Sequence, residues 1–150
     1  MYSSSLEDAL RQFGKREFRP MQRELMECSL RGLSCIGILP TGAGKSLCYQ
    51  IPAVLMDGVT VVVSPLIALM RDQVAGLEKL GVAAARYDSS LSDEEKEALM
   101  GSLKSGVVRL LFAAPESLES PWMQQAMEFV SPGLFVVDDC LLYTSPSPRD

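Results

Sequence analysis

A loop of small residues between two apolar segments constrains the fold of this chain more than any other feature. Residues 40–46 read PTGAGKS. The short apolar segment 35–39 before them predicts a buried strand, and the mostly apolar segment 47–56 after them is long enough for a core helix. Small residues let successive backbone N–H groups turn toward an anion, and the following helix adds the positive end of its dipole. This order of strand, loop and helix predicts a phosphate-binding P-loop.

Two side chains of the loop carry the predicted chemistry. Lys45 is expected to reach the β- and γ-phosphates of ATP, and the Ser46 hydroxyl to take a position on Mg²⁺. Leu39 stands where the general pattern G-x-x-x-x-G-K-[ST] has its first glycine, and the alternative is a turn whose small residues serve only tight backbone geometry. The predicted nucleotide-binding residues of the loop are Thr41, Gly42, Ala43, Gly44, Lys45 and Ser46.

Length, charge and composition limit the classes of protein to which this chain can belong. A chain of 150 residues can form one domain with a real core, and no apolar run is long enough to cross a membrane. The formal net charge of −5 argues mildly against nucleic acid, although a local basic cluster can act on an acidic background. Since residues 1–5 lack a secretory signal, we expect a protein of the cytoplasm or nucleoid. With no zinc-site spacing, the cysteines are interpreted as buried free thiols: Cys28, Cys35, Cys48 and Cys140.

Alternating helical and strand patterns predict an α/β fold. Almost wholly apolar strands that alternate with helices indicate a parallel sheet covered on both faces, that is, three layers. Ser5 and Asp8 predict a capping box at the first helix. Helices are expected at 5–13, 20–31, 47–56, 65–80, 92–103 and 120–130, and strands at 35–39, 59–64, 83–87, 107–113 and 134–138.

Asp138 ends the last predicted strand. In parallel sheets, ligands bind at the carboxyl ends of the strands. A carboxylate there suits Mg²⁺, which is a hard ion and prefers oxygen ligands. We therefore interpret Asp138 as a metal-holding Walker B aspartate, the alternative being an acidic residue that leaves a strand for solvent.

Four segments, taken together and in this order, resemble the RecQ-type DNA helicases of superfamily 2: residues 13–22, 39–50, 61–74 and 110–118. The resemblance implies a RecA-like P-loop NTPase domain, the first of two motor domains and here truncated. It implies ATP-dependent 3′–5′ unwinding of DNA in repair and recombination, with Gln22 at the edge of adenine and Arg19 helping to hold the nucleotide. A second RecA-like domain of the full-length chain would supply an arginine finger. The residues expected to contact DNA are Ser64, Pro65, Leu66, Arg71, Gln73, Pro115 and Glu116.

Three positions depart from the family pattern. The family has an aromatic residue at the position of Lys15, where it stacks on adenine, and an arginine at the position of Ser117. Asp139 stands where the family has the glutamate that orients the attacking water. The resemblance thus implies Lys45, Asp138 and the shortened Asp139 as catalytic residues.

The last residues match nothing in the family. Residues 140–150 resemble the translation of a transposase-type sequencing adapter, and we expect them to be non-native; a genuine Ser/Pro-rich tail is the alternative. We predict N-terminal helices with the adenine segment at 1–33 and the incomplete ATP-binding domain at 34–139. Alone, these residues are expected to bind nucleotide weakly and to separate no strands.

Other functions share part of this pattern. A P-loop small-molecule kinase would have the same loop and sheet, but it would lack the 64–74 segment and the Arg19/Gln22 pair. A non-catalytic nucleotide-binding module is a further alternative. An RNA helicase of the same superfamily is another alternative, and it would differ only in which residues stand in the motifs.

Overall fold

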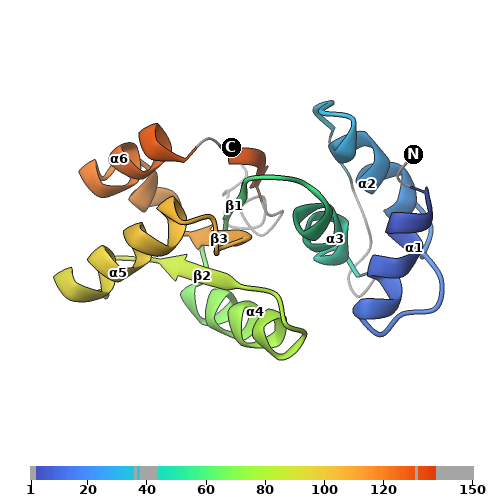
Figure 1. Cartoon of the computed structure of the whole chain (residues 1–150), viewed down its shortest axis with the longest axis horizontal. Helices are drawn as coiled ribbons and strands as arrows, with labels where there is room; N and C mark the ends of the chain where they lie inside the picture. The colour runs from blue at the N-terminus through green and yellow to red at the C-terminus, as the bar shows by residue number, and fades with distance from the viewer. Residues whose placement is uncertain (1–2, 36, 38–43, 131, 138–150) are drawn as a thin grey trace, which may run out of the picture. The chain divides into compact units, whose positions relative to one another are not determined.

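The computed structural model describes residues 3–35, 37, 44–130 and 132–137. It divides into two compact units, residues 1–57 and 58–150 (Figure 1). This division does not test the predicted boundaries at residues 33 and 139, which stay predictions. Within the described part of the chain, every helix is too short or too polar to cross a membrane.

In its described residues, the first unit contains three helices. They are α1 (Ser3–Gln12), α2 (Gln22–Leu30) and α3 (Leu47–Leu55), and α3 packs against both of the others. Because α1 begins at Ser3, Ser5 lies inside the helix and its predicted role as the cap is wrong. Three consecutive serines offer the same side-chain oxygen, so the pattern could not tell where among them the helix begins. Of the strand predicted at 35–39, Cys35 and Gly37 are not in a strand, and the other positions lie outside the described residues.

The second unit contains a parallel sheet of four strands in the order β2-β3-β1-β4. Val63 of β1 pairs with Ala113 of β3 and Val137 of β4, and Ala113 pairs with Tyr87 of β2. The strands therefore end at one level and share a carboxyl edge. Their bounds are Val59–Val63 (β1), Ala84–Tyr87 (β2), Leu110–Ala113 (β3) and Pro132–Val137 (β4).

Helices cover both faces of this sheet, which confirms the predicted three-layer α/β architecture. α4 (Ile67–Lys79) lies on one side of the strands, and α5 (Asp93–Lys104) and α6 (Pro121–Phe129) lie on the other (Figure 1). The cap predicted for α5 is confirmed: the Ser92 hydroxyl accepts from the Glu95 N–H at 3.1 Å, and the Glu95 carboxylate accepts from the Ser92 N–H at 2.9 Å. A 3₁₀ helix over Pro115–Glu119 (η1) was not predicted from the sequence.

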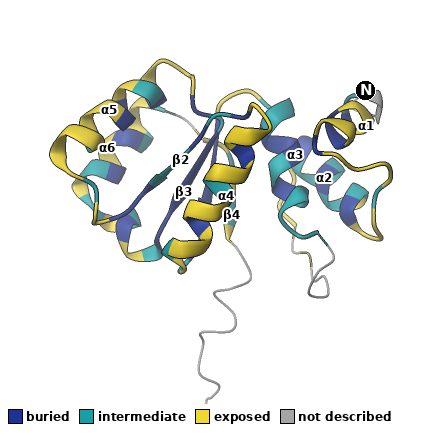
Figure 2. Ribbon diagram, turned by 90° about the horizontal axis from the view of Figure 1, so that it is seen from below, coloured by how far each residue is buried: buried dark blue, intermediate teal, exposed yellow. Residues whose placement is uncertain are grey.

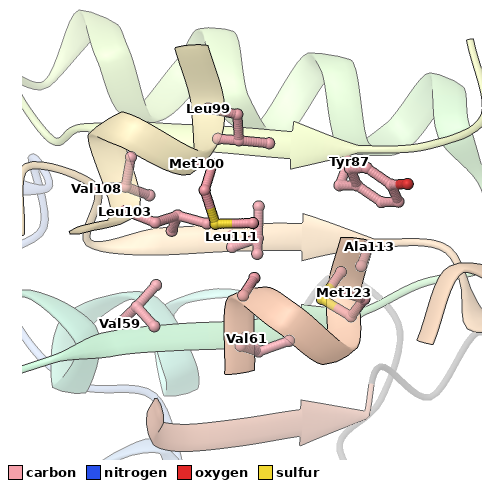
Figure 3. Close-up of a cluster of buried hydrophobic side chains, with 11 residues drawn as sticks. Val59, Val61, Tyr87, Leu99, Met100, Leu103, Val108, Leu111, Ala113 and Met123 are labelled. Carbon is pink, nitrogen blue, oxygen red and sulfur yellow. The ribbon is translucent and has the colours of Figure 1, made fainter. Parts of the chain in front are cut away.

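The core follows from the alternation of side chains along apolar strands. All five residues of β1 are buried, so successive side chains enter the core on opposite faces. The neighbouring strand β3 is buried along its length in the same way (Figure 2). One face packs against α5 and α6 through a buried cluster (Figure 3). The members of this cluster are Val59, Val61, Tyr87, Leu99, Met100, Leu103, Val108, Leu111, Ala113, Met123 and Ala126.

An aromatic stack joins this core to the start of α6. The rings of Tyr87 and Trp122 lie 4.2 Å apart between centroids with an angle of 8° between their planes. The indole N–H of Trp122 donates to the Lys96 carbonyl at 3.2 Å, which satisfies its one polar group. The stack thus ties β2, α5 and α6 together.

Asp88, the first residue after β2, is a buried carboxylate with paired oxygens. The Ser90 N–H donates to it at 2.8 Å, the Ser90 hydroxyl also donates to it, and the Arg86 guanidinium forms an ion pair with it. Burial opposes ionisation, but the bonds from Ser90 and the charge of Arg86 outweigh burial and hold the pKa of Asp88 below its ordinary value. The ionised carboxylate therefore stabilises the turn that follows β2.

The lowered pKa of Asp88 predicts a loss of stability in acid. A carboxylate with a lowered folded-state pKa stabilises the protein above its unfolded pKa of about 4, and this contribution is lost as pH falls through the folded pKa. Asp88→Asn should cost about 1–3 kcal/mol at pH 7, because it leaves buried donors poorly matched, and the cost should shrink toward pH 3. Urea unfolding at several pH values measures this. Asp72→Asn, at an exposed site on α4, is the control, and a cost for D88N that does not change with pH would contradict the assignment.

Candidate nucleotide-binding site

Gln22 is the centre of the candidate site in the first unit. Its side chain is only 1% exposed, although glutamine is usually a surface residue. Its Oε1 atom accepts from the Arg19 N–H at 2.8 Å, and its Nε2 atom donates to the Gly44 carbonyl at 3.0 Å. The carboxamide thus joins the segment before α2 to the end of the predicted phosphate loop.

Gly44 fits this arrangement because it has no side chain. Its φ of +74° lies in the left-handed region that favours glycine. A Cβ atom at Gly44 would meet Nε2 of Gln22 at 2.6 Å, closer than such atoms approach. The Gly44 carbonyl also accepts from the Leu47 N–H at 3.2 Å, so one backbone oxygen fixes both Gln22 and the start of α3.

Lys45 and Ser46 form the turn that leads into α3. Both are half-buried, and their carbonyls accept from the N–H groups of Cys48 and Gln50 at 3.0 and 2.9 Å. Ser46 occupies the N-cap position, yet its side chain makes no capping hydrogen bond. A cation and a hydroxyl therefore sit together at a helix N-terminus, where the helix dipole favours an anion.

The other predicted nucleotide and metal residues are placed less completely. Arg19 is exposed in the turn before α2. Lys15, at the position where the family has an aromatic residue, is also exposed. The following predicted residues lie outside the described residues: Thr41, Gly42, Ala43, Asp138 and Asp139.

Met21 carries backbone strain beside Gln22. Among the described residues, it is the one non-glycine with a positive φ, at 73°, and its side chain is 50% exposed. The left-handed region costs an L-residue roughly 1–2 kcal/mol. Met21 is also the N-cap of α2, but its side chain makes no capping hydrogen bond. Neither a capping bond nor burial of the side chain therefore compensates the backbone strain.

The cysteines of this unit are free, as predicted, but they are not buried as predicted. Cys28 and Cys48 are half-buried and Cys35 is exposed, and neither Cys35 nor Gly37 lies in the strand that was predicted for this segment. Burial, with a smaller contribution from Cys35, raises the pKa of Cys48 to about 11. Burial and then Cys28 raise the pKa of Cys35.

The predicted DNA-contacting residues lie in the second unit, at or near the carboxyl edge of the sheet. Ser64 follows β1, is buried, and donates its N–H to the Ala113 carbonyl at 3.0 Å. Pro65 and Pro115 are half-buried at the starts of the segments that follow β1 and β3, whereas Leu66 and Glu116 are exposed. On α4, Arg71 is exposed and Gln73 is half-buried, while Ser117 of η1 is buried. The structure thus brings Ser64, Pro65, Leu66, Pro115 and Glu116 to one edge.

Sequence reasoning missed two features of these units. The hydrogen bond between Gln22 and Gly44 joins residues 22 positions apart, and no local sequence pattern predicts it. The buried Asp88 had a usable signal: an aspartate at a strand end with a serine two residues later is typical of an Asx turn. Both involve polar side chains whose partners are backbone groups.

The family assignment follows from a comparison with known protein families. The profile described as DEAD/DEAH box helicase matches residues 19–146. The chain belongs to this family. The matched range begins at Arg19 and includes Gln22, the phosphate loop and the sheet, so it spans both units of this helicase-family chain.

Curated relatives of this DEAD/DEAH box chain carry RecQ-type names. The ATP-dependent DNA helicase RecQ of Synechocystis sp. is 45% identical over 117 residues, which are 77% of this chain and 24% of that protein. The probable ATP-dependent DNA helicase RecS of Bacillus subtilis is 38% identical over 128 residues, which are 85% of this chain and 25% of that protein. The predicted resemblance to RecQ-type helicases is confirmed, and the chain spans about a quarter of the length of these relatives.

A solved structure supports the fold. The crystal structure of a hypothetical ATP-dependent RNA helicase from Sulfolobus tokodaii matches with a TM-score of 0.68, covering 94% of this chain and 42% of that one. Because the identity is 19%, this likeness concerns the fold alone. Together with the parallel sheet, it confirms the predicted RecA-like architecture.

Substitution of Gly44 tests its close approach to Gln22. Gly44→Ala should lower the free energy of unfolding by about 1–3 kcal/mol more than Gly32→Ala, because only the first displaces the buried carboxamide. Gly32 is the matched control, since its φ is +76° and nothing lies within 4 Å of an added Cβ. Urea unfolding followed by circular dichroism measures both. Equal losses in the two variants would show that Gln22 does not depend on the missing side chain.

Substitution of Met21 tests whether its backbone is strained. Met21→Gly should stabilise the first unit by up to about 1 kcal/mol, because relief of left-handed strain exceeds the added chain entropy of glycine. Met21→Ala keeps the Cβ atom and should give no gain. Thermal unfolding of the two variants distinguishes them, and a gain from alanine equal to that from glycine would rule out backbone strain as the cause.

Proposed function

We propose that this chain is the ATP-binding part of a RecQ-type ATP-dependent DNA helicase, acting in the cytoplasm or nucleoid. The observation that carries the proposal is the buried Gln22 carboxamide, bonded to Arg19 on one side and to Gly44 of the phosphate loop on the other. The edge of adenine suits an amide, which offers donor and acceptor together. Because the Gln22 carboxamide is buried and already bonded to Arg19 and Gly44, contact with the base would require it to exchange these partners. This arrangement connects recognition of a base with the position of the loop that takes its phosphates.

The residues of the first unit fit a nucleoside triphosphate with Mg²⁺. Gly44 leaves space that a Cβ atom would fill, and Lys45 supplies a positive charge at the start of α3. The Ser46 hydroxyl, which makes no capping bond, can serve as an oxygen ligand. The bound metal would neutralise charge on the β- and γ-phosphates.

Hydrolysis requires a water molecule directed at the γ-phosphorus. In this proposal Lys45 would stabilise the charge that develops on the phosphate oxygens, and Asp138 would help to hold the metal. Asp139 orients the attacking water in place of the expected glutamate. Because aspartate is one methylene shorter, its carboxylate reaches less far, and we expect slow hydrolysis. The arginine finger would come from a second RecA-like domain.

The carboxyl edge of the sheet is the proposed path of a DNA strand. Ser64, Pro65 and Leu66 follow β1, and Pro115 and Glu116 follow β3, at one level of the sheet. Hydroxyl and backbone N–H groups bind phosphates without a basic surface, which is compatible with the net charge of −5. Arg71 and Gln73 on α4 would add side-chain contacts.

The comparisons favour this function over its alternatives. A small-molecule kinase shares the loop, but the family match over residues 19–146 is to helicases. Relatives at 38–45% identity are named DNA helicases, which favours DNA over RNA as the substrate. Unwinding in DNA repair and recombination is the role that we propose for the full-length protein.

Lys45→Ala tests the nucleotide site. Loss of charge-assisted bonds of about 1.5–3 kcal/mol should weaken ATP binding by roughly 10–100-fold, measured by titration with a fluorescent ATP analogue and Mg²⁺. Lys79→Ala, at the exposed end of α4, should bind as the unchanged protein does. In the full-length protein, single-stranded DNA should stimulate ATP hydrolysis, and K45A should abolish that stimulation. Unchanged affinity in K45A would refute the site; stimulation by RNA but not by DNA would refute the substrate.

A further inference from the structure

We propose that Trp122, stacked on Tyr87 and with the Lys96 ammonium beside the pair, holds one base of a single DNA strand. The inference rests on the proposed function, because it adds a binding position to the path of the strand along the carboxyl edge of the sheet. Trp122 offers the base a flat surface, and Lys96 offers a positive charge to a neighbouring phosphate.

The aromatic pair lies at the carboxyl edge of the sheet. Tyr87 ends β2 and pairs with Ala113, the last residue of β3, and Figure 3 shows both at the ends of their strands. Trp122 is in the first turn of α6, which follows η1 in the chain and packs against it. η1 begins with Pro115 and Glu116, two residues of the proposed path. The pair is therefore next to this path.

The indole of Trp122 is held in one orientation. Its N–H donates to the Lys96 carbonyl at 3.2 Å, and its ring lies parallel to the Tyr87 ring within 8°. The turn that carries Trp122 is fixed as well, because the Ser120 hydroxyl caps α6 and accepts from the Met123 N–H at 3.1 Å. A surface that is already ordered loses little conformational entropy when a ligand binds to it.

The accessible part of the pair belongs to the tryptophan. Tyr87 is only 5% exposed, whereas Trp122 is half-buried. Because Tyr87 covers one face of the indole, the surface of the indole that solvent reaches lies away from the tyrosine. Accessible aromatic rings stack on the bases of single strands with little regard to sequence, since every base has a π-face.

Lys96 supplies a charge beside this surface. Its ammonium lies 5.9 Å from the centroid of the Tyr87 ring, and its side chain is half-buried. Asp93 and Glu94 begin the same helix, α5, and their carboxylates repel phosphates in front of its first turn. An aromatic surface with one cation, bordered by acidic residues, suits a base and a single phosphate better than a run of phosphates.

A second pair of a cation and an aromatic ring on the same two helices provides a matched control. The Lys104 ammonium lies 4.0 Å from the centroid of the Phe129 ring, and Phe129 is 57% exposed. These residues end α5 and α6, just before β3 and β4 begin, so they lie at the amino edge of the sheet. An effect of exposed aromatic rings in general would appear at Phe129 at least as strongly as at Trp122.

Oligonucleotide binding tests the stacking. The probes are a labelled oligothymidine and a strand of the same length without bases, followed by fluorescence anisotropy at low salt. Trp122→Leu should weaken oligothymidine binding roughly 5- to 100-fold, which is what loss of one stacked base costs, and should leave binding of the abasic strand unchanged. Trp122→Phe keeps an aromatic ring and should retain most of the affinity. Phe129→Leu is the control and should bind as the unchanged protein does.

Photochemical cross-linking locates the base. A strand that carries 5-iodouracil forms a covalent bond to an aromatic ring stacked on it when it is irradiated. The expected product joins the strand to the tryptic peptide 110–149, and fragmentation should place the bond at Trp122. A bond at Phe129 instead would overturn the proposal.

Lys96→Ala tests the charge. The indole bonds to the main-chain carbonyl of Lys96, so this change keeps that acceptor. The slope of the logarithm of affinity against the logarithm of salt concentration should become shallower by about 0.7, the value for one phosphate contact of a single strand. Lys104→Ala should keep the original slope, and an equal change in both variants would contradict the role of Lys96.

The outcomes distinguish this role from the proposed function. If the unchanged protein binds neither strand, the proposed DNA path fails and the stacking role fails with it. If the protein binds oligothymidine but Trp122→Leu binds it equally well, the stacking role alone is overturned. Circular dichroism checks that the variants keep the fold. Should Trp122→Leu not fold, the position of the cross-link in the unchanged protein and the salt slope of Lys96→Ala still decide.

Discussion

The carboxamide of Gln22 joins the segment before α2 to Gly44, a residue 22 positions further along the chain. A buried amide left without partners costs about 1–3 kcal/mol, so the Arg19 N–H and the Gly44 carbonyl are required as well as present. The geometry also requires that Gly44 lack a side chain, and the strained backbone of Met21 places Gln22 at the start of α2. In the function that we propose, the segment that would meet adenine and the loop that would take the phosphates are thereby linked before any ligand arrives, which would reduce the ordering that binding requires.

Much of the fold could be predicted because the signals are local. Val59–Val63 is β-branched throughout and apolar except at Thr60, and such a run favours a buried strand. Ser92 and Glu95 lie three residues apart, as a capping box needs, and both bonds form. Alternation of strands with helices then predicts a parallel sheet. The register of that sheet brings Ser64 and Pro115 to one edge.

The features that could not be predicted from the sequence depend on contacts between distant segments or on rare backbone conformations. The Gly44 carbonyl, which accepts from Gln22, is 22 residues away along the chain. No sequence pattern predicts the positive φ of Met21. Cys35 was expected in a buried strand from its apolar neighbours, yet it is exposed and lies outside a strand. A polar or small residue within an apolar stretch does not reveal which side of the segment meets solvent, and composition alone therefore overestimates burial.

The stack of Tyr87 on Trp122 has a practical consequence. The chain contains one tryptophan, and it belongs entirely to the second unit. Indole emission excited near the red edge of its absorption therefore reports the packing around the sheet and is blind to the three-helix unit. Comparing this emission with a signal averaged over the whole backbone would reveal whether the two units melt together or in separate steps.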